Sequence, residues 1–169
     1  GDLMIEHEQT LNNIKSELLT LYVNASEGYK SFNTYFHIFQ ESVFKFFDIK
    51  NIHFFIVQDR LLKPTNPSFN KELFRNGIEW AKFEYYFEET NIVSTPEPFI
   101  NSEPFSQLDQ MMVIRKNNNE PFGVIFFEST YFWHSFANST YINEFLVVVS
   151  KLFLTIYDSI EIRLNEIHY

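Results

Sequence analysis

Apolar residues recur at alternating spacings of three and four positions near both ends of this chain, which is the heptad pattern of paired helices. Narrow apolar stripes of this kind are typical of helices that meet one partner along a seam. We therefore expect a long helix in residues 1–27 and another in residues 140–169. Gly28 is a suitable stop for the first, and Asn138, Ser139 and Thr140 can cap the last.

We interpret the two stripes as surfaces that pair with a second copy of the chain in a parallel homodimer. The N-terminal helix would serve dimerisation, and the C-terminal helix would carry a signal onward. His7 interrupts the first stripe and Arg163 the last. The expected dimer interface consists of Leu11, Ile14, Leu18, Leu21, Leu146, Val149, Phe153, Ile156 and Ile160.

The central part of the chain predicts strands and further helices. Residues 31–47 have a broad apolar face and favour a helix capped by Ser31, whereas residues 51–58 are β-branched and aromatic and favour a buried strand. A return strand at 60–63 would end at Pro64. We expect a helix between Ser68 and Glu88, broken at Gly77, although its second half fits a strand equally well.

The clearest local pattern is a β-hairpin in the last third of the chain. Residues 111–116 and 121–128 are apolar strands separated by a polar four-residue turn. A short strand at 91–95 and a proline-rich loop precede this hairpin. The 45% of apolar residues is enough to bury one core, so we expect 1–169 to form a single domain whose sheet needs cover on both faces.

Composition narrows the classes of partner. A formal net charge of −9 argues against nucleic acid and anionic lipid, which attract clustered Lys and Arg. The lack of cysteine excludes disulfides and thiolate metal sites. No apolar run approaches the roughly 20 residues of a membrane-spanning helix, and the first residues lack signal-peptide features. We expect a cytoplasmic domain that contacts neither nucleic acid nor membrane.

No arrangement of residues in the sequence indicates catalysis. The five histidines show no spacing typical of an acid–base pair, and the four glycines do not recur as in a phosphate-binding loop. We interpret Glu84, Glu88 and Glu89 as a solvated face, and His134 beside Trp133 is the one histidine worth testing for metal. We therefore expect no enzyme activity, no metal and no cofactor in this segment.

The hairpin from Met112 to Ser129, which includes Phe122-Gly123-Val124-Ile125-Phe126-Phe127, and the long helix after it resemble the end of a GAF domain. This resemblance implies an α+β fold, an α/β/α sandwich around an antiparallel sheet of about five or six strands. The terminal helices would cover one sheet face, and crossover helices and loops would cover the other. It also implies a non-catalytic sensory domain of a bacterial signalling protein, able to bind an unidentified small molecule.

The last ten residues, 160–169, resemble the connector that precedes a GGDEF diguanylate cyclase domain. The resemblance implies an output in cyclic di-GMP synthesis, and a histidine kinase stays open as the alternative. Asn70-Lys71 and the segment Phe105 to Gln110 approach the signature of cyclic-nucleotide-binding GAF domains. Gln110 stands where that signature has Glu, and the gap is too long, so we interpret this likeness as chance.

Candidate pocket residues follow from strand alternation and from aromatic side chains with polar tips. The strands offer two sets on opposite faces, and the alternation does not say which face lines a pocket. If the pocket is filled by the chain's own aromatic rings, a ligand-free dimerisation or interaction module remains. The candidates are Phe54, Ile56, Met112 and Ile114 from the strands and Trp80, Tyr85 and Tyr86 from the crossover.

Overall fold

The computed structural model describes residues 2–27 and 30–168, including side chains except those of 26 and 159–168. The chain divides into two compact units, Gly1–Asp48 with Thr130–Tyr169 and Ile49–Ser129. The first unit is helical, and the second contains one six-stranded antiparallel sheet with short helices. The expected α+β class and strand number are confirmed. The placement of the terminal helices over one sheet face stays a prediction.

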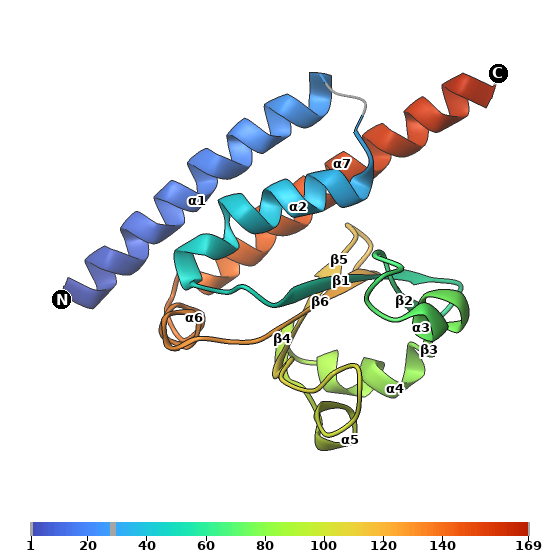
Figure 1. Ribbon diagram of the computed structural model, residues 1–169. Helices are drawn as coiled ribbons and strands as arrows, with labels where there is room; N and C mark the ends of the chain where they lie inside the picture. Colours follow the sequence, from blue (N-terminus) through green and yellow to red (C-terminus); the bar gives the residue numbers. More distant parts are fainter. Residues whose placement is uncertain (1, 28–29, 169) are drawn as a thin grey trace. The chain divides into compact units, whose positions relative to one another are not determined.

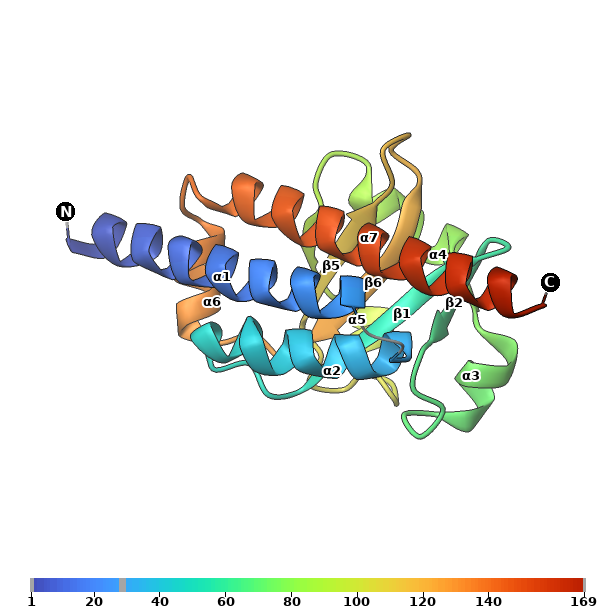
Figure 2. The same cartoon turned by 90° about the horizontal axis from the view of Figure 1, so that it is seen from above.

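Three long helices lie side by side in the helical unit (Figures 1 and 2). These are α1 (Asp2–Glu27), α2 (Phe32–Ser42) and α7 (Ile142–His168). The unit also contains the 3₁₀ helix η1 (Phe44–Phe47), which follows α2, and α6 (Tyr131–Ala137), which precedes α7. Helices α1 and α7 run in the same direction, while α2 runs back against them (Figure 2). The long helices expected at both ends of the chain are therefore confirmed.

Aromatic rings fill the core of the helical unit. Phe39 of α2 packs edge to face on Phe153 of α7, with ring centroids 4.7 Å apart. Phe47 of η1 contacts Trp133 of α6 at 5.2 Å and Phe145 of α7 at 5.8 Å. Such tilted and edge-to-face pairs are the arrangements that aromatic quadrupoles favour. These rings join the chain's N-terminal segment to its C-terminal segment within one core.

The sheet has the strand order β3-β2-β1-β6-β5-β4, and every neighbouring pair is antiparallel. Its central strands are β1 (Ile52–Gln58), β6 (Pro121–Phe127) and β5 (Gln110–Arg115). Strands β2 (Leu61–Pro64), β3 (Ile78–Glu79) and β4 (Ile92–Ser94) complete it, with the short helices α3 (Lys71–Asn76), α4 (Ala81–Glu84), η2 (Tyr85–Phe87) and α5 (Glu97–Ile100) between them. The predicted hairpin and the strands at 51–58, 60–63 and 91–95 are confirmed.

Residues 68–88 form α3, β3, α4 and η2, and the expected break in the helix lies at Gly77. This residue has φ +70°, and a Cβ there would lie 2.9 Å from Lys63 Cγ. Glycine adopts such a conformation without steric cost, so the chain leaves α3 and pairs with the sheet as β3. The helix α6 was not expected. Its signal is Thr130, whose hydroxyl caps the helix by accepting from Trp133 N–H at 3.2 Å.

The register of the central strands assigns their residues to two faces. Phe55 lies opposite Val124, and Phe54 lies opposite Ile125. The face that carries Phe55 and Val124 packs against the short crossover elements. Its aromatic and aliphatic core consists of Phe55, Leu62, Trp80, Phe83, Phe87, Phe105, Leu108, Met111, Val113, Val124 and Phe126.

Candidate functional site

The structure does not bring the seven expected pocket residues together. One face of the sheet carries Phe54, Ile56, Met112 and Ile114. Phe54 and Met112 both lie opposite Ile125, and Ile56 and Ile114 both lie opposite Gly123. Trp80 belongs to the core on the other face. Tyr85 is 73% exposed on η2, and Tyr86 is half-buried. The sequence predicted the alternation within each strand, but it did not place Trp80 relative to the strands.

Trp80 is the one expected pocket residue with an unusual polar environment. Its side chain is 1% exposed, and its ring lies almost parallel to that of Phe87 at 6.0 Å. Among the described residues, no acceptor lies within hydrogen-bonding distance of the indole Nε1–H. A buried donor of this kind costs about 1–3 kcal/mol of stability.

His53 lies on the same face as the crossover core. Its Nε2 is 3.2 Å from Asn51 Oδ1, and its ring stacks on Phe69 with centroids 4.0 Å apart. Burial lowers the pKa of His53 below its ordinary value, because the charged imidazolium loses hydration there. His53 is therefore a packed histidine of the sheet, and burial favours its neutral form.

The residues that approach the cyclic-nucleotide signature have structural roles. The Asn70 side chain caps α3 by accepting a hydrogen bond from Leu73 N–H at 2.9 Å. The carboxylate of Asp109 accepts from both Ser129 N–H and Ser129 Oγ–H, at 2.7 and 2.5 Å. These contacts hold a helix start and the end of β6, which agrees with the interpretation of the likeness as chance.

The structure corrects the expected dimer interface. Seven of its nine residues are buried within the single chain, namely Leu11, Ile14, Leu18, Leu21, Val149, Phe153 and Ile156. Leu146 is half-buried, and the side chain of Ile160 lies outside the described residues. The seams are buried because α1 and α7 pack on each other and on α2. The heptad spacing thus predicts helix pairing correctly, but the partner helices belong to the same chain.

A different apolar surface of these helices faces solvent. Leu19, Tyr22 and Val23 of α1 are 64%, 45% and 46% exposed, and Val147 of α7 is 52% exposed. We call these four residues the outer α1–α7 surface. The sequence holds a signal for it, because residues 19, 22 and 23 are one turn apart and follow the heptad stripe on its flank. Sequence reasoning missed them by treating the stripe itself as the exposed side.

An open groove of about 250 Å³ runs between α1 and α7 beside this surface, and we call it the α1–α7 groove. Its lining is almost wholly apolar. Lys15 at its edge forms an ion pair with Glu144, whereas no ion pair of Lys151 is found within the part of the chain that the structure describes. The lining residues are Lys15, Leu18, Leu19, Tyr22, Val148, Lys151, Leu152 and Thr155.

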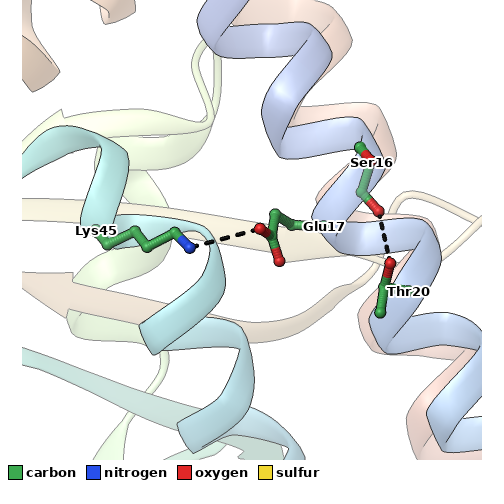
Figure 3. A network of polar contacts seen from close by, with 4 residues as sticks. All are labelled: Ser16, Glu17, Thr20 and Lys45. Atoms are coloured by element: carbon green, nitrogen blue, oxygen red, sulfur yellow. Dashed lines mark hydrogen bonds and ion pairs between the residues drawn. The ribbon is translucent and has the colours of Figure 1, made fainter.

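Polar contacts hold α1 at several points along its length. His7 Nε2 lies 2.9 Å from Ser135 Oγ of α6, and its ring meets Phe136 edge to face at 5.9 Å. Figure 3 shows the ion pair of Glu17 with Lys45 of η1, at 3.5 Å. The histidine that interrupts the heptad stripe is therefore a buried polar contact within the helical unit.

Neither a metal-binding cluster nor a single membrane-spanning helix is found among the described residues. No group of three or more His, Asp or Glu side chains in residues 2–27 and 30–158 is arranged to hold a metal ion. No single described helix has both the length and the apolar character needed to cross a bilayer. Among the described helices, the bent pair Tyr131–Ala137 and Ile142–Asp158 meets these criteria when its two members are combined. Comparison with known proteins finds no matching family model and no matching curated protein.

Proposed function

We propose that this chain is a non-catalytic sensory module of the GAF type that works as a homodimer and controls a C-terminal output domain. The observation that carries the proposal is the parallel pair α1 and α7 (Figure 2), whose residues Leu19, Tyr22, Val23 and Val147 are exposed to solvent. The hairpin β5–β6 followed directly by helices also agrees with the resemblance of residues 112–129 to this family.

The outer α1–α7 surface supports association with a second copy. Leu19 and Val147 are each more than half exposed, and an apolar groove lies between their helices. Contiguous apolar surface on a soluble protein commonly marks an interaction site. A two-fold axis along the groove would place the same four residues of both copies against each other, because such interfaces are self-complementary.

In the proposed mechanism, the helices that move are α1 and α7, which pack on each other along the buried seams. A signal would bias two packings of α7 against α1, and the shift or rotation of α7 would reach the output domain. The ligand or partner must bind one packing more tightly than the other for this to occur. The output we propose is cyclic di-GMP synthesis, supported by the likeness of residues 160–169 to a cyclase connector, with a histidine kinase as the alternative.

Light scattering with substitutions on the outer surface tests the dimer. We expect the unchanged chain to be a dimer at micromolar concentration, and Val23→Asp and Val147→Asp to shift it to monomer. Phe74→Asp is the matched control, because Phe74 of α3 is similarly exposed outside the helical unit. A monomeric unchanged chain, or a Phe74→Asp variant that dissociates equally, would contradict the proposal.

A second candidate function is a dimerisation and interaction module without a ligand in the sheet unit. Close ring packing in the crossover core favours it: Phe83 stacks on Phe99 at 4.4 Å, and Phe126 lies 4.9 Å from both Phe55 and Phe105. These rings fill the crossover core, to which Trp80 of the expected pocket belongs. Xenon or benzene titration followed by methyl NMR distinguishes the two candidates, because only an unfilled pocket would take up the probe.

A further inference from the structure

The α1–α7 groove combines an apolar lining with a cationic side chain. Leu18 and Leu152 are buried and form its floor, and Leu19, Tyr22 and Val148 form its walls. A lining of this kind gains free energy by covering an apolar molecule. It offers few hydrogen-bonding groups to a sugar, nucleotide or peptide backbone.

The charges at the groove favour an anionic head group. Lys15 is neutralised by its ion pair with Glu144. Lys151 belongs to the same lining, and no ion pair of its ammonium is found among the described residues. Lys15 and Lys151 are the charged members of this lining, and both are cationic.

The volume of the groove limits the size of the apolar part of a ligand. An apolar cavity of about 150 Å³ holds benzene, with six carbon atoms. On the same scale, the 250 Å³ of the groove corresponds to roughly ten carbon atoms. One alkyl chain of this length fits, and its narrow shape suits a groove between two parallel helices.

We propose that the α1–α7 groove binds a medium-chain carboxylate, with the alkyl chain against Leu19, Val148 and Leu152 and the carboxylate at the Lys151 ammonium. This inference goes beyond the proposed function by naming a ligand class and a site in the helical unit. The molecule is a free monomer in this proposal, and a lipid bilayer is an outcome that the test distinguishes.

The probe is decanoate below its critical micelle concentration, titrated into the chain with methyl-resolved NMR and calorimetry. We expect binding of one molecule per chain, with nuclear Overhauser contacts from the alkyl chain to methyl groups of Leu19, Val148 and Leu152. Decyltrimethylammonium, which has the opposite charge, should bind more weakly. Contacts located elsewhere, equal binding of the cation, or binding only to micelles and vesicles would overturn the inference.

Two substitutions separate the head-group and chain contributions. Lys151→Gln should weaken decanoate binding about two- to fivefold, the range of an exposed ion pair, while Lys82→Gln on α4 changes the net charge equally and should have no effect. Leu19→Ser should weaken it about three- to tenfold by removing apolar contact. Equal binding by Lys151→Gln and the unchanged chain would overturn the assignment of the head group.

One consequence rests on the proposed function. Because Leu19 and Tyr22 belong both to the groove and to the outer α1–α7 surface, a bound alkyl chain would compete with the second copy. Decanoate should therefore shift the light-scattering mass toward monomer. The Val23→Asp variant keeps the two proposals apart, since Val23 does not line the groove: decanoate binding by this variant supports the groove site whether or not the chain dimerises.

Discussion

The ring of Phe54 on β1 lies directly against Gly123 on β6, and a Cβ at this glycine would be 2.5 Å from the ring's Cζ. The same Cβ would be 2.8 Å from the carbonyl oxygen of Phe55, which belongs to the backbone of the neighbouring strand. The glycine of the β5–β6 hairpin thus has a packing role, because it makes room for a buried aromatic ring at the centre of the sheet.

We expect Gly123→Ala to lower the free energy of unfolding by about 1–3 kcal/mol, because both the ring and the neighbouring strand must shift. Denaturant unfolding followed by circular dichroism measures the change. Combining it with Phe54→Leu should recover only part of the loss, since the contact with the Phe55 carbonyl remains. An unchanged stability for Gly123→Ala alone would contradict this packing.

Tyr35→Phe should leave stability unchanged or raise it by about 1–2 kcal/mol, because it removes a buried hydroxyl that has no hydrogen-bond partner among the described residues. Tyr35 is 1% exposed on α2, so the ring would remain packed. Thermal unfolding of both proteins gives the comparison. Tyr22→Phe, at an exposed position, is the control and should have almost no effect. A marked loss of stability in Tyr35→Phe would show that this hydroxyl is bonded.

Arg115→Lys should lower stability by about 1–3 kcal/mol although it keeps the charge. The guanidinium of Arg115 donates to Asn91 Oδ1 at 3.1 Å and to the carbonyl oxygens of Asn119 and Phe87, each at 2.9 Å. A lysine ammonium cannot reach three acceptors in this planar arrangement. Urea unfolding should show the loss, and Arg75→Lys on exposed α3 should stay within about 0.5 kcal/mol of the unchanged chain.

Stability should fall as the pH is lowered below about 6.5, with His53 contributing to the slope. Burial lowers the folded-state pKa of His53, so the unfolded chain binds its proton at a higher pH than the folded chain does. As the pH falls from the pKa of His53 in the unfolded chain toward its lower pKa in the folded chain, protonation favours unfolding. Above this pH range His53 contributes no pH dependence to stability.

Urea unfolding at a series of pH values measures this slope, and His53→Phe should reduce it because phenylalanine does not titrate. The same replacement at exposed His37 is the control for the loss of a histidine elsewhere. Identical slopes in the unchanged chain and in His53→Phe would show that His53 is not perturbed by burial.

Local patterns predicted most of the secondary structure correctly. The apolar spacing at Leu11, Ile14, Leu18 and Leu21 belongs to α1, and the strand–turn–strand pattern around residues 111–128 belongs to β5 and β6. Both depend on periodicity within one element, which the sequence contains directly. The break predicted at Gly77 within residues 68–88 is present. The sequence left helix and strand open for the part after it, and pairing with β2 makes Ile78–Glu79 a strand before α4 begins.

The sequence by itself determined that each terminal helix carries an apolar seam and that the strands alternate between two faces. Only the tertiary structure decided what those surfaces meet. Leu18 and Val149 are covered within one chain, Leu19 and Val147 remain in solvent, and Trp80 packs on the face opposite to Phe54. The physical reason is that periodicity arises from the local geometry of helix and strand, whereas the partner of each face depends on contacts between different elements of the fold.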